Sequence, residues 1–219
     1  MTLDLMHDVL EGCAKYLMLY VLKTLPLNEL NDAWSLFPFK RNDKSNASMS
    51  FTIAQLQKDQ LTGLTSSMML TLIRFLPLVV KESDVTISTK TPWWSIYMDF
   101  LTLMDILMAQ SYTEERLVDL QNRAESYLER YQRAGGHMTV KSHFLLHEAD
   151  VIRQMGPLRW SWCMRYEAAH RPIKQYAVVN RNHQNVAMTY AEKIQHSKMN
   201  LYQSMNESKL LIAFFDGSL

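Results

Sequence analysis

Two acidic residues near the start of the chain have a spacing that could bind a cation. The stretch D-L-M-H-D covers residues 4–8, and on a helix Asp4 and Asp8 would share one face with His7 beside them. Two carboxylates on one face repel each other unless a cation neutralises them. A negatively charged first turn that complements the helix dipole is the alternative explanation. The residues therefore predict either a metal site or an ordinary acidic start of a helix.

A second candidate site is the histidine pair in H-F-L-L-H, residues 143–147. Two imidazoles four residues apart on a helix can bind one metal ion from a single face, as in the HExxH metalloproteases. Here Phe144 stands where those enzymes have the glutamate that acts as general base. His143 and His147 are therefore expected to be either zinc ligands without protease chemistry or two half-buried residues of a packed helix.

The third candidate is C-M-R-Y-E-A-A-H-R-P-I-K, residues 163–174. Helical spacing would place Glu167 on one face with His170, Arg171 and Lys174. An exposed ion pair between Glu167 and Arg171, worth about 0.3–0.5 kcal/mol at best, is the simpler explanation. A carboxylate beside cations that could meet phosphates is nevertheless what a metal-dependent phosphoryl-transfer site requires.

Charge is distributed unevenly along the chain. The 219 residues carry a formal net charge of only +1, so the total charge does not indicate a polyanionic partner. Residues 159–198 contain seven Lys or Arg against two acids, which gives this segment +5 and leaves −4 for the remainder. A basic segment on a slightly acidic body predicts either a nucleic-acid contact or a solvated helix face.

Composition argues against a disulfide scaffold and against a membrane protein. The chain has two cysteines and no CxxC pair, which also argues against a self-contained four-ligand zinc module built on cysteine pairs. Its first residues include acids and a histidine where a signal peptide needs basic and then apolar residues. The longest apolar stretch, 64–80, contains Arg74 and Pro77 and is not typical of a membrane span. We therefore expect a soluble, intracellular protein.

The elements that must position these residues are helices, because Gly and Pro are few and apolar residues recur at helical spacing. The predicted helices are 5–24, 28–34, 52–61, 64–80, 92–110, 113–134, 141–154, 164–178 and 183–206. The clearest of them, 113–134, starts at Thr113 with acids in its first turn and ends before a Gly-Gly pair. Residues 39–50 are expected to form a polar loop, and only 84–89 and 160–166 show short strand patterns.

Taken together, the three candidate stretches resemble the motifs of a known family. They are D-L-M-H-D-V-L-E-G near the start, H-F-L-L-H before G-P-L-R-W, and W-C-M-R-Y-E-A-A-H-R-P-I-K-Q in the last third. In order and spacing they are similar to motifs of the transposases of CACTA and related animal DNA transposons, over nearly the whole chain. The resemblance implies an RNase H-like domain in which Asp, Asp and Glu hold two divalent ions for DNA cleavage and strand transfer.

The resemblance implies roles for individual residues. Asp4 matches the second acid and Glu167 the third, so both are implied as catalytic residues and as ligands of Mg²⁺ or Mn²⁺. Residues 5–166 between them then correspond to a helical insertion. His143 and His147 resemble a histidine pair that, in some such insertions, shares a zinc ion with an upstream Cys pair, which this chain lacks.

A set of cations is implied to contact DNA phosphates, which position DNA without reading its sequence. These residues are Lys141, Arg165, His170, Arg171 and Lys174. The expected partner is DNA at transposon ends, with a second copy of the chain as a possible further partner and no membrane. The resemblance also implies a location in the nucleus.

The sequence thus predicts a mainly α fold, the C-terminal part of an RNase H-like (DDE) transposase catalytic domain with a large helical insertion and little sheet. The expected parts are 1–24 with the second acid, the insertion 25–157, and the basic segment 158–219 with the third acid. In this family the strand that carries the first acid would precede Met1, so we expect this chain alone to be inactive.

Two other functions fit parts of the pattern. One is a non-catalytic helical interaction or DNA-associating protein derived from a transposon. The other is an all-helical HD-type phosphohydrolase, suggested by His7 and Asp8, although that family also needs a histidine upstream of the pair.

Overall fold

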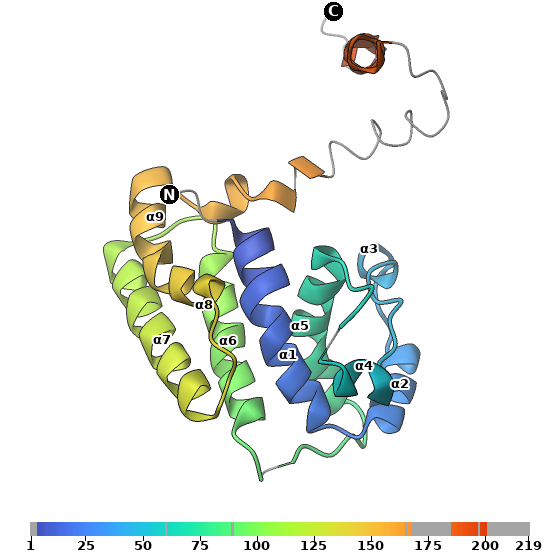
Figure 1. The fold of residues 1–219 in the computed structure, drawn as a ribbon, viewed down its shortest axis with the longest axis vertical. Coiled ribbons are helices and arrows are strands. Elements are labelled where there is room, and N and C mark those ends of the chain that lie inside the picture. The colour runs from blue at the N-terminus through green and yellow to red at the C-terminus, as the bar shows by residue number, and fades with distance from the viewer. Residues whose placement is uncertain are drawn as a thin grey trace, which may run out of the picture. The chain divides into compact units, whose positions relative to one another are not determined.

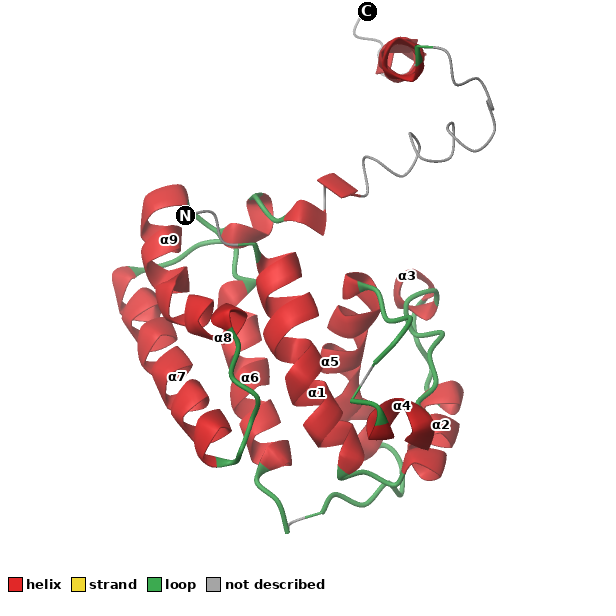
Figure 2. Ribbon diagram, viewed as in Figure 1, coloured by secondary structure: helices red, strands yellow, loops and turns green. Residues whose placement is uncertain are grey.

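The computed structural model describes residues 4–59, 61–88, 90–164, 166–167, 185–196 and 198–200. They belong to two compact units, Met1–Met164 and Arg165–Leu219. Within the described ranges the regular structure is helical and contains no strand (Figure 2). This confirms the prediction of a mainly α fold.

The first unit contains a succession of helices joined by mostly short loops (Figure 1). In chain order they are η1 (Leu5–Cys13), α1 (Ala14–Lys23), α2 (Leu27–Leu36), α3 (Arg41–Lys44), α4 (Ile53–Gln57), α5 (Ser66–Lys81), α6 (Trp93–Leu107), α7 (Glu114–Arg133), α8 (Val140–Phe144), η2 (Leu145–His147), α9 (Glu148–Met155) and η3 (Leu158–Trp160). η1 is a π-helix, whereas η2 and η3 are short 3-10 helices.

In the second unit, residues 186–196 and 198–200 are helical. They lie inside the helix predicted over 183–206. The helix predicted over 164–178 falls largely outside the described residues. The strand patterns at 84–89 and 160–166 form no strand in those of their residues that the structure describes.

Helix α1 is the centre of the first unit, where it contacts α5 on one side and α6 on the other (Figure 1). It is buried through most of its length, with Leu17, Val21 and Leu22 fully inaccessible to solvent. A helix covered on several sides must be apolar around most of its circumference. This explains why the segment is rich in Leu, Met and Val rather than amphipathic.

Helices α6 and α7 pack side by side (Figure 1). As predicted, Thr113 marks the start of α7: it is the N-cap residue, and its side chain accepts a hydrogen bond from the Arg116 N–H. Its buried residues recur every three or four positions: Leu117, Leu120, Ala124, Tyr127, Leu128 and Tyr131. The other positions of this helix are mostly polar, so α7 is a surface helix with one apolar stripe.

A proline inside α5 is compensated by a tyrosine from α6. Pro77 has no N–H, so it cannot donate to the carbonyl of Ile73, its acceptor in a regular helix. The hydroxyl of Tyr97, which is fully buried, donates to that carbonyl at 2.5 Å. The carbonyl of Ile73, which has no N–H partner at Pro77, is therefore satisfied by Tyr97 of α6.

The polar segment 39–50 is held against the unit by hydrogen bonds rather than by a long helix. It contains the single-turn helix α3, although we expected only a loop there. The indole N–H of Trp34 donates to the carbonyl of Ala47, and the side chain of Asn31 both donates to and accepts from the backbone of Phe51.

In the described residues, no helix has both the length and the apolar character that crossing a membrane would require.

Candidate functional site

Asp4 stands at the N-terminus of η1, as the residue that caps this helix. Its carboxylate accepts hydrogen bonds from the His7 backbone N–H at 3.2 Å and from the His7 ring Nδ1 at 2.5 Å. The helix it caps is unusual, because the Ala14 N–H bonds to the carbonyl of Val9, five residues earlier. π-helical turns of this kind are rare and occur frequently at functional sites.

A residue from the other end of the first unit completes the surroundings of Asp4. The backbone N–H of Cys163 donates to Asp4 Oδ1 at 2.8 Å, and the Cys163 side chain also hydrogen-bonds to this carboxylate. Burial alone would raise the pKa of Asp4, but the hydrogen bonds from Cys163 and His7 outweigh it and lower the pKa. Asp4 is therefore held as an ionised carboxylate.

The segment that carries Cys163 is fixed to the helical body on both sides. Leu158 is buried in the core, and Met164 packs against the core with its sulfur 3.9 Å from the Ser67 hydroxyl on α5. The side chain of Arg159 donates to the carbonyl of Met108 at the end of α6. Cys163 is thus positioned by packing and not only by its bond to Asp4.

Two further acids lie close to Asp4. Asp8 accepts a hydrogen bond from the Asp4 backbone N–H at 2.9 Å, so both carboxylates satisfy N–H groups at the start of η1. Glu148, the first residue of α9, is fully buried, and neither of its carboxyl oxygens has a hydrogen-bond partner. Burial, followed by the charges of Asp8 and Asp4, raises the pKa of Glu148 to about 8.

Lys141, which we expected to contact DNA phosphates, lies on α8 against η1. Its ammonium group donates to the carbonyl of His7 at 2.7 Å. A Cβ atom at Gly12 would come within 2.6 Å of the Lys141 side chain, so this glycine allows the close approach of α8. The buried Cys13 thiol donates to the Lys141 carbonyl at 3.4 Å, and burial raises its pKa to about 12.

The two histidines predicted as zinc ligands lie next to each other, in α8 and η2. Their Nε2 atoms are 3.0 Å apart, so both could lie about 2.1 Å from one point, the usual zinc–nitrogen distance. His143 is exposed and His147 partly exposed. Among the described residues, no third His, Cys, Asp or Glu forms a potential ligand group with them. A zinc ion at this pair stays a prediction.

The single helix predicted over 141–154 consists of three elements, α8, η2 and α9. A 3-10 turn at 145–147 separates α8 from α9. Glu148 is buried together with Leu145 and Ile152, which stand three residues before it and four residues after it and are also buried.

The remaining predicted residues belong to the second unit. Glu167 is described and helical there. Arg165, His170, Arg171 and Lys174 lie outside the described residues.

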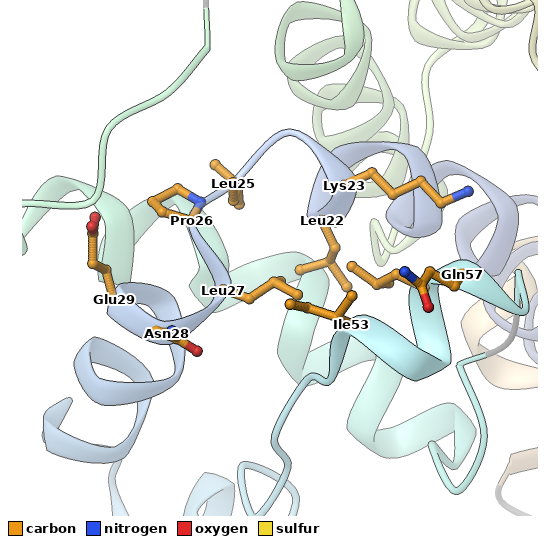
Figure 3. Close-up of a pocket in the computed structure, with 10 residues that line it drawn as sticks. Leu22, Lys23, Leu25, Pro26, Leu27, Asn28, Glu29, Ile53 and Gln57 are labelled. Atoms are coloured by element: carbon orange, nitrogen blue, oxygen red, sulfur yellow. The ribbon is translucent and has the colours of Figure 1, made fainter.

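A separate pocket lies at the junction of α1, α2 and α4 (Figure 3). Its lining is mostly apolar and includes Leu22, Leu27 and Ile53. None of the residues predicted as catalytic, metal-binding or DNA-binding lines it. Its composition suits an apolar surface rather than a metal ion or a phosphate.

Sequence reasoning singled out Asp4 and His7, but it missed Cys163 as a member of the same cluster and Glu148 as a buried acid that interacts with Asp4 and Asp8. Cys163 had a weak signal, because it stands four residues before Glu167 in the motif that suggested a site. Contact between residues 4 and 163 depends on the whole helical body and could not be inferred from spacing.

No protein-family model matches this sequence, and neither a curated protein nor a solved structure is similar to it.

Proposed function

We propose that this chain derives from a DDE-type transposase with an RNase H-like fold and that it associates with DNA through its basic C-terminal segment, 158–219. In this proposal Asp4 and Glu167 are the second and third acids of the ancestral site. The observation that carries the proposal is the hydrogen bond between the Cys163 N–H and the Asp4 carboxylate.

This bond matters because of where Glu167 stands in the chain. Glu167 follows Cys163 by four residues, and four residues span at most about 14 Å of extended backbone. Asp4 is therefore tied to the point from which the chain continues to Glu167. The acids of a DDE site share two divalent ions about 3.5–4 Å apart, so in the ancestral enzyme Asp4 and Glu167 would both have to reach the same pair of ions.

The described neighbours of Asp4 do not fit the Mg²⁺ or Mn²⁺ of the ancestral enzyme. Mg²⁺ prefers oxygen ligands in near-octahedral geometry, whereas the donor atoms grouped with the Asp4 carboxylate come from the imidazole of His7 and the thiol of Cys163. Of the two nearby acids, Asp8 accepts a hydrogen bond from the Asp4 backbone N–H and Glu148 is fully buried. The Asp4 oxygens already accept hydrogen bonds from His7 and Cys163. We therefore propose DNA association rather than DNA cleavage as the activity of this chain.

The charge distribution supports DNA as the partner. Residues 159–198 carry +5, against −4 for the rest of the chain. Lys and Arg that neutralise phosphates release counterions, and this gives sequence-independent binding with a dissociation constant of roughly 10⁻⁴–10⁻⁶ M at physiological salt. Such a partner would place the protein in the nucleus, and a second copy of the chain could bind the same duplex.

A second candidate function is a helical interaction module without DNA. It is favoured by apolar side chains left on the surface of the first unit, such as Leu36 and Ile53, which are 82% and 62% exposed. Ile53 also lines the apolar pocket of Figure 3. A protein partner with an apolar helix would cover this surface.

Fluorescence anisotropy of the whole chain with duplex DNA of arbitrary sequence tests the proposal. We expect weak binding that falls steeply as salt rises, together with no detectable nicking of supercoiled plasmid in Mg²⁺ or Mn²⁺. Binding that does not depend on salt, or no binding, would favour the interaction module. Robust nicking that Glu167→Gln abolishes would instead show a complete enzyme.

A further inference from the structure

Three side chains with different donor atoms meet at the start of η1. The carboxylate of Asp4, the ring of His7 and the thiol of Cys163 each offer a ligand atom, and these atoms all lie within 4.8 Å of one another. All three residues are partly exposed, so an ion could reach them from solvent. Oxygen, nitrogen and sulfur are the three donor types that zinc accepts in proteins.

We propose that Asp4, His7 and Cys163 bind one Zn²⁺ ion. The inference goes beyond the proposed function and does not depend on it, because it rests on the geometry of the first unit alone. With three protein ligands the ion would keep a fourth position for water or another donor, as zinc sites that are not purely structural do.

The distances suit a tetrahedral ion after small side-chain rotations. Ligand atoms bound at about 2.0–2.3 Å lie about 3.3–3.8 Å from each other in a tetrahedron. The Asp4 and His7 atoms are now closer, at 2.5 Å, because a hydrogen bond joins them. Binding would replace this contact and that of the Cys163 side chain with bonds to the ion, while the Cys163 N–H could keep its bond to Asp4 Oδ1.

The proton balance of binding is simple. The thiol of Cys163 gives up its proton to solvent, since the thiolate is the form that binds metals. The Nδ1 of His7 now donates to Asp4, so a neutral ring that binds the ion through Nδ1 would carry this proton on Nε2 instead and would release none. Each Zn²⁺ bound to the neutral ring therefore releases one proton, and no oxidant or reductant takes part.

The donor set also decides which ion is favoured. A thiolate and an imidazole select zinc over magnesium, which takes oxygen ligands. The surrounding charges are mixed. Asp8 and Glu148 act electrostatically near the cluster, whereas the Lys141 ammonium is bonded to the carbonyl of His7.

The position of the site gives it a structural consequence. Asp4 and His7 belong to the first turn of η1, whereas Cys163 lies one residue before the end of the first unit. An ion bound by all three residues would cross-link the beginning of the first unit to its end. The hydrogen bond from the Cys163 N–H to Asp4 already joins the same two segments. Zinc should therefore raise the thermal stability of the protein, because it binds the folded state.

Cobalt(II) titration tests the proposal, with Co²⁺ as the spectroscopic substitute for zinc. The protein used is the full chain with His143→Gln and His147→Gln, which removes the other potential zinc site. We expect one Co²⁺ per chain, a thiolate-to-cobalt absorption band in the near ultraviolet, and displacement by Zn²⁺ but not by millimolar Mg²⁺. The free energy that zinc adds to folding is read from the melting temperature of the same protein.

Matched variants identify the ligands. Cys163→Ser should remove the absorption band and weaken Co²⁺ binding at least about 100-fold. Substituting a residue that only hydrogen-bonds to a metal ligand already lowers metal affinity about 10–100-fold, and Cys163 would be a ligand itself. Cys13→Ser, which changes the only other cysteine, should keep both the band and the affinity. His7→Gln should also weaken binding, whereas His137→Gln, at an exposed histidine near Tyr16, should not.

A measurement on the unsubstituted thiols covers the case in which Cys163→Ser does not fold. Saturating Zn²⁺ should slow alkylation of Cys163 at least about tenfold, as metal ligation removes the free thiolate that reacts. Cobalt binding without a thiolate band, or alkylation of Cys163 that zinc leaves unchanged, would overturn the proposal. Displacement of Co²⁺ by Mg²⁺ would instead identify an oxygen-ligand site, as a complete DDE enzyme needs.

Discussion

Cys163 donates its backbone N–H to the carboxylate of Asp4 over 2.8 Å, although 159 positions separate the two residues in the chain. The bond joins the N-terminus of η1 to the last residues of the first unit, Met1–Met164. It also links two of the three stretches of sequence that resemble transposase motifs, those that contain Asp4 and Cys163. The proposed ancestry is argued from this contact, whereas the proposed zinc site is argued from the side-chain donor atoms of Asp4, His7 and Cys163.

The first prediction concerns this bond. Asp4→Ala removes the acceptor, so the Cys163 amide should exchange with solvent roughly 10–100-fold faster, as expected for a hydrogen bond to a charged group worth about 1.5–3 kcal/mol. Amide hydrogen exchange followed by NMR or mass spectrometry measures this. Asp32→Ala, which removes an exposed acid on α2, serves as the control and should leave the amide unchanged. Equal exchange in both variants would show that the bond does not hold the segment.

The second prediction concerns the pH dependence contributed by Glu148. Its pKa is about 8 in the folded protein and near 4.5 when unfolded. Between these values the folded state binds one more proton than the unfolded state, so the free energy of unfolding should fall as pH rises from about 5 to about 8. Glu148→Gln cannot bind this proton, so its free energy of unfolding should not show this decrease. Between about pH 5 and pH 8 the decrease amounts to up to a few kcal/mol in the unsubstituted protein.

Chemical denaturation at several pH values measures this slope. The slope is a better readout than stability at one pH, because a buried glutamine amide would also lack partners. Glu115→Gln, at an exposed position of α7, should keep the slope of the unsubstituted protein. A Glu148→Gln variant with an unchanged slope would show that Glu148 does not hold its proton in the folded state.

The third prediction concerns Tyr97 and Pro77. Tyr97→Phe leaves the buried Ile73 carbonyl without the hydroxyl that now donates to it, and an unsatisfied buried group costs about 1–3 kcal/mol. With Pro77→Ala the residue at 77 regains an N–H that can donate to Ile73, so the same Tyr97→Phe change should cost less. A double-mutant cycle of unfolding free energies gives the difference. A cost of Tyr97→Phe that is equal in both backgrounds would contradict this coupling.

Sequence reasoning predicted the helical body well where the signals are local. Thr113 with acids after it predicts the start of α7, and Pro92 predicts the start of α6, because capping and proline geometry act over a few residues. The π-helical turn of η1 was not predicted, since its residues have the same apolar spacing as those of an α-helix. The short α3 was missed because a single turn leaves almost no periodicity.

The candidate site could be predicted only in part for a related reason. Asp4 and His7 are three residues apart, so helical spacing alone brings them together. Cys163 meets them only because the core places the two ends of the first unit side by side. The burial of Glu148 likewise depends on how α9 packs. In the sequence its only local indication was that Glu148 shares a helix face with the apolar Leu145 and Ile152.

The central claim is that the basic C-terminal segment binds DNA phosphates, and the salt dependence of DNA binding tests it most directly. Arg171→Ala with Lys174→Ala should lower the slope of log K against log salt by up to about two units, one for each lost phosphate contact. Arg41→Ala with Lys44→Ala removes the same charge from the exposed helix α3 and should leave the slope nearly unchanged. If both double variants lower the slope equally, or neither does, binding is not localised to this segment and the claim is contradicted.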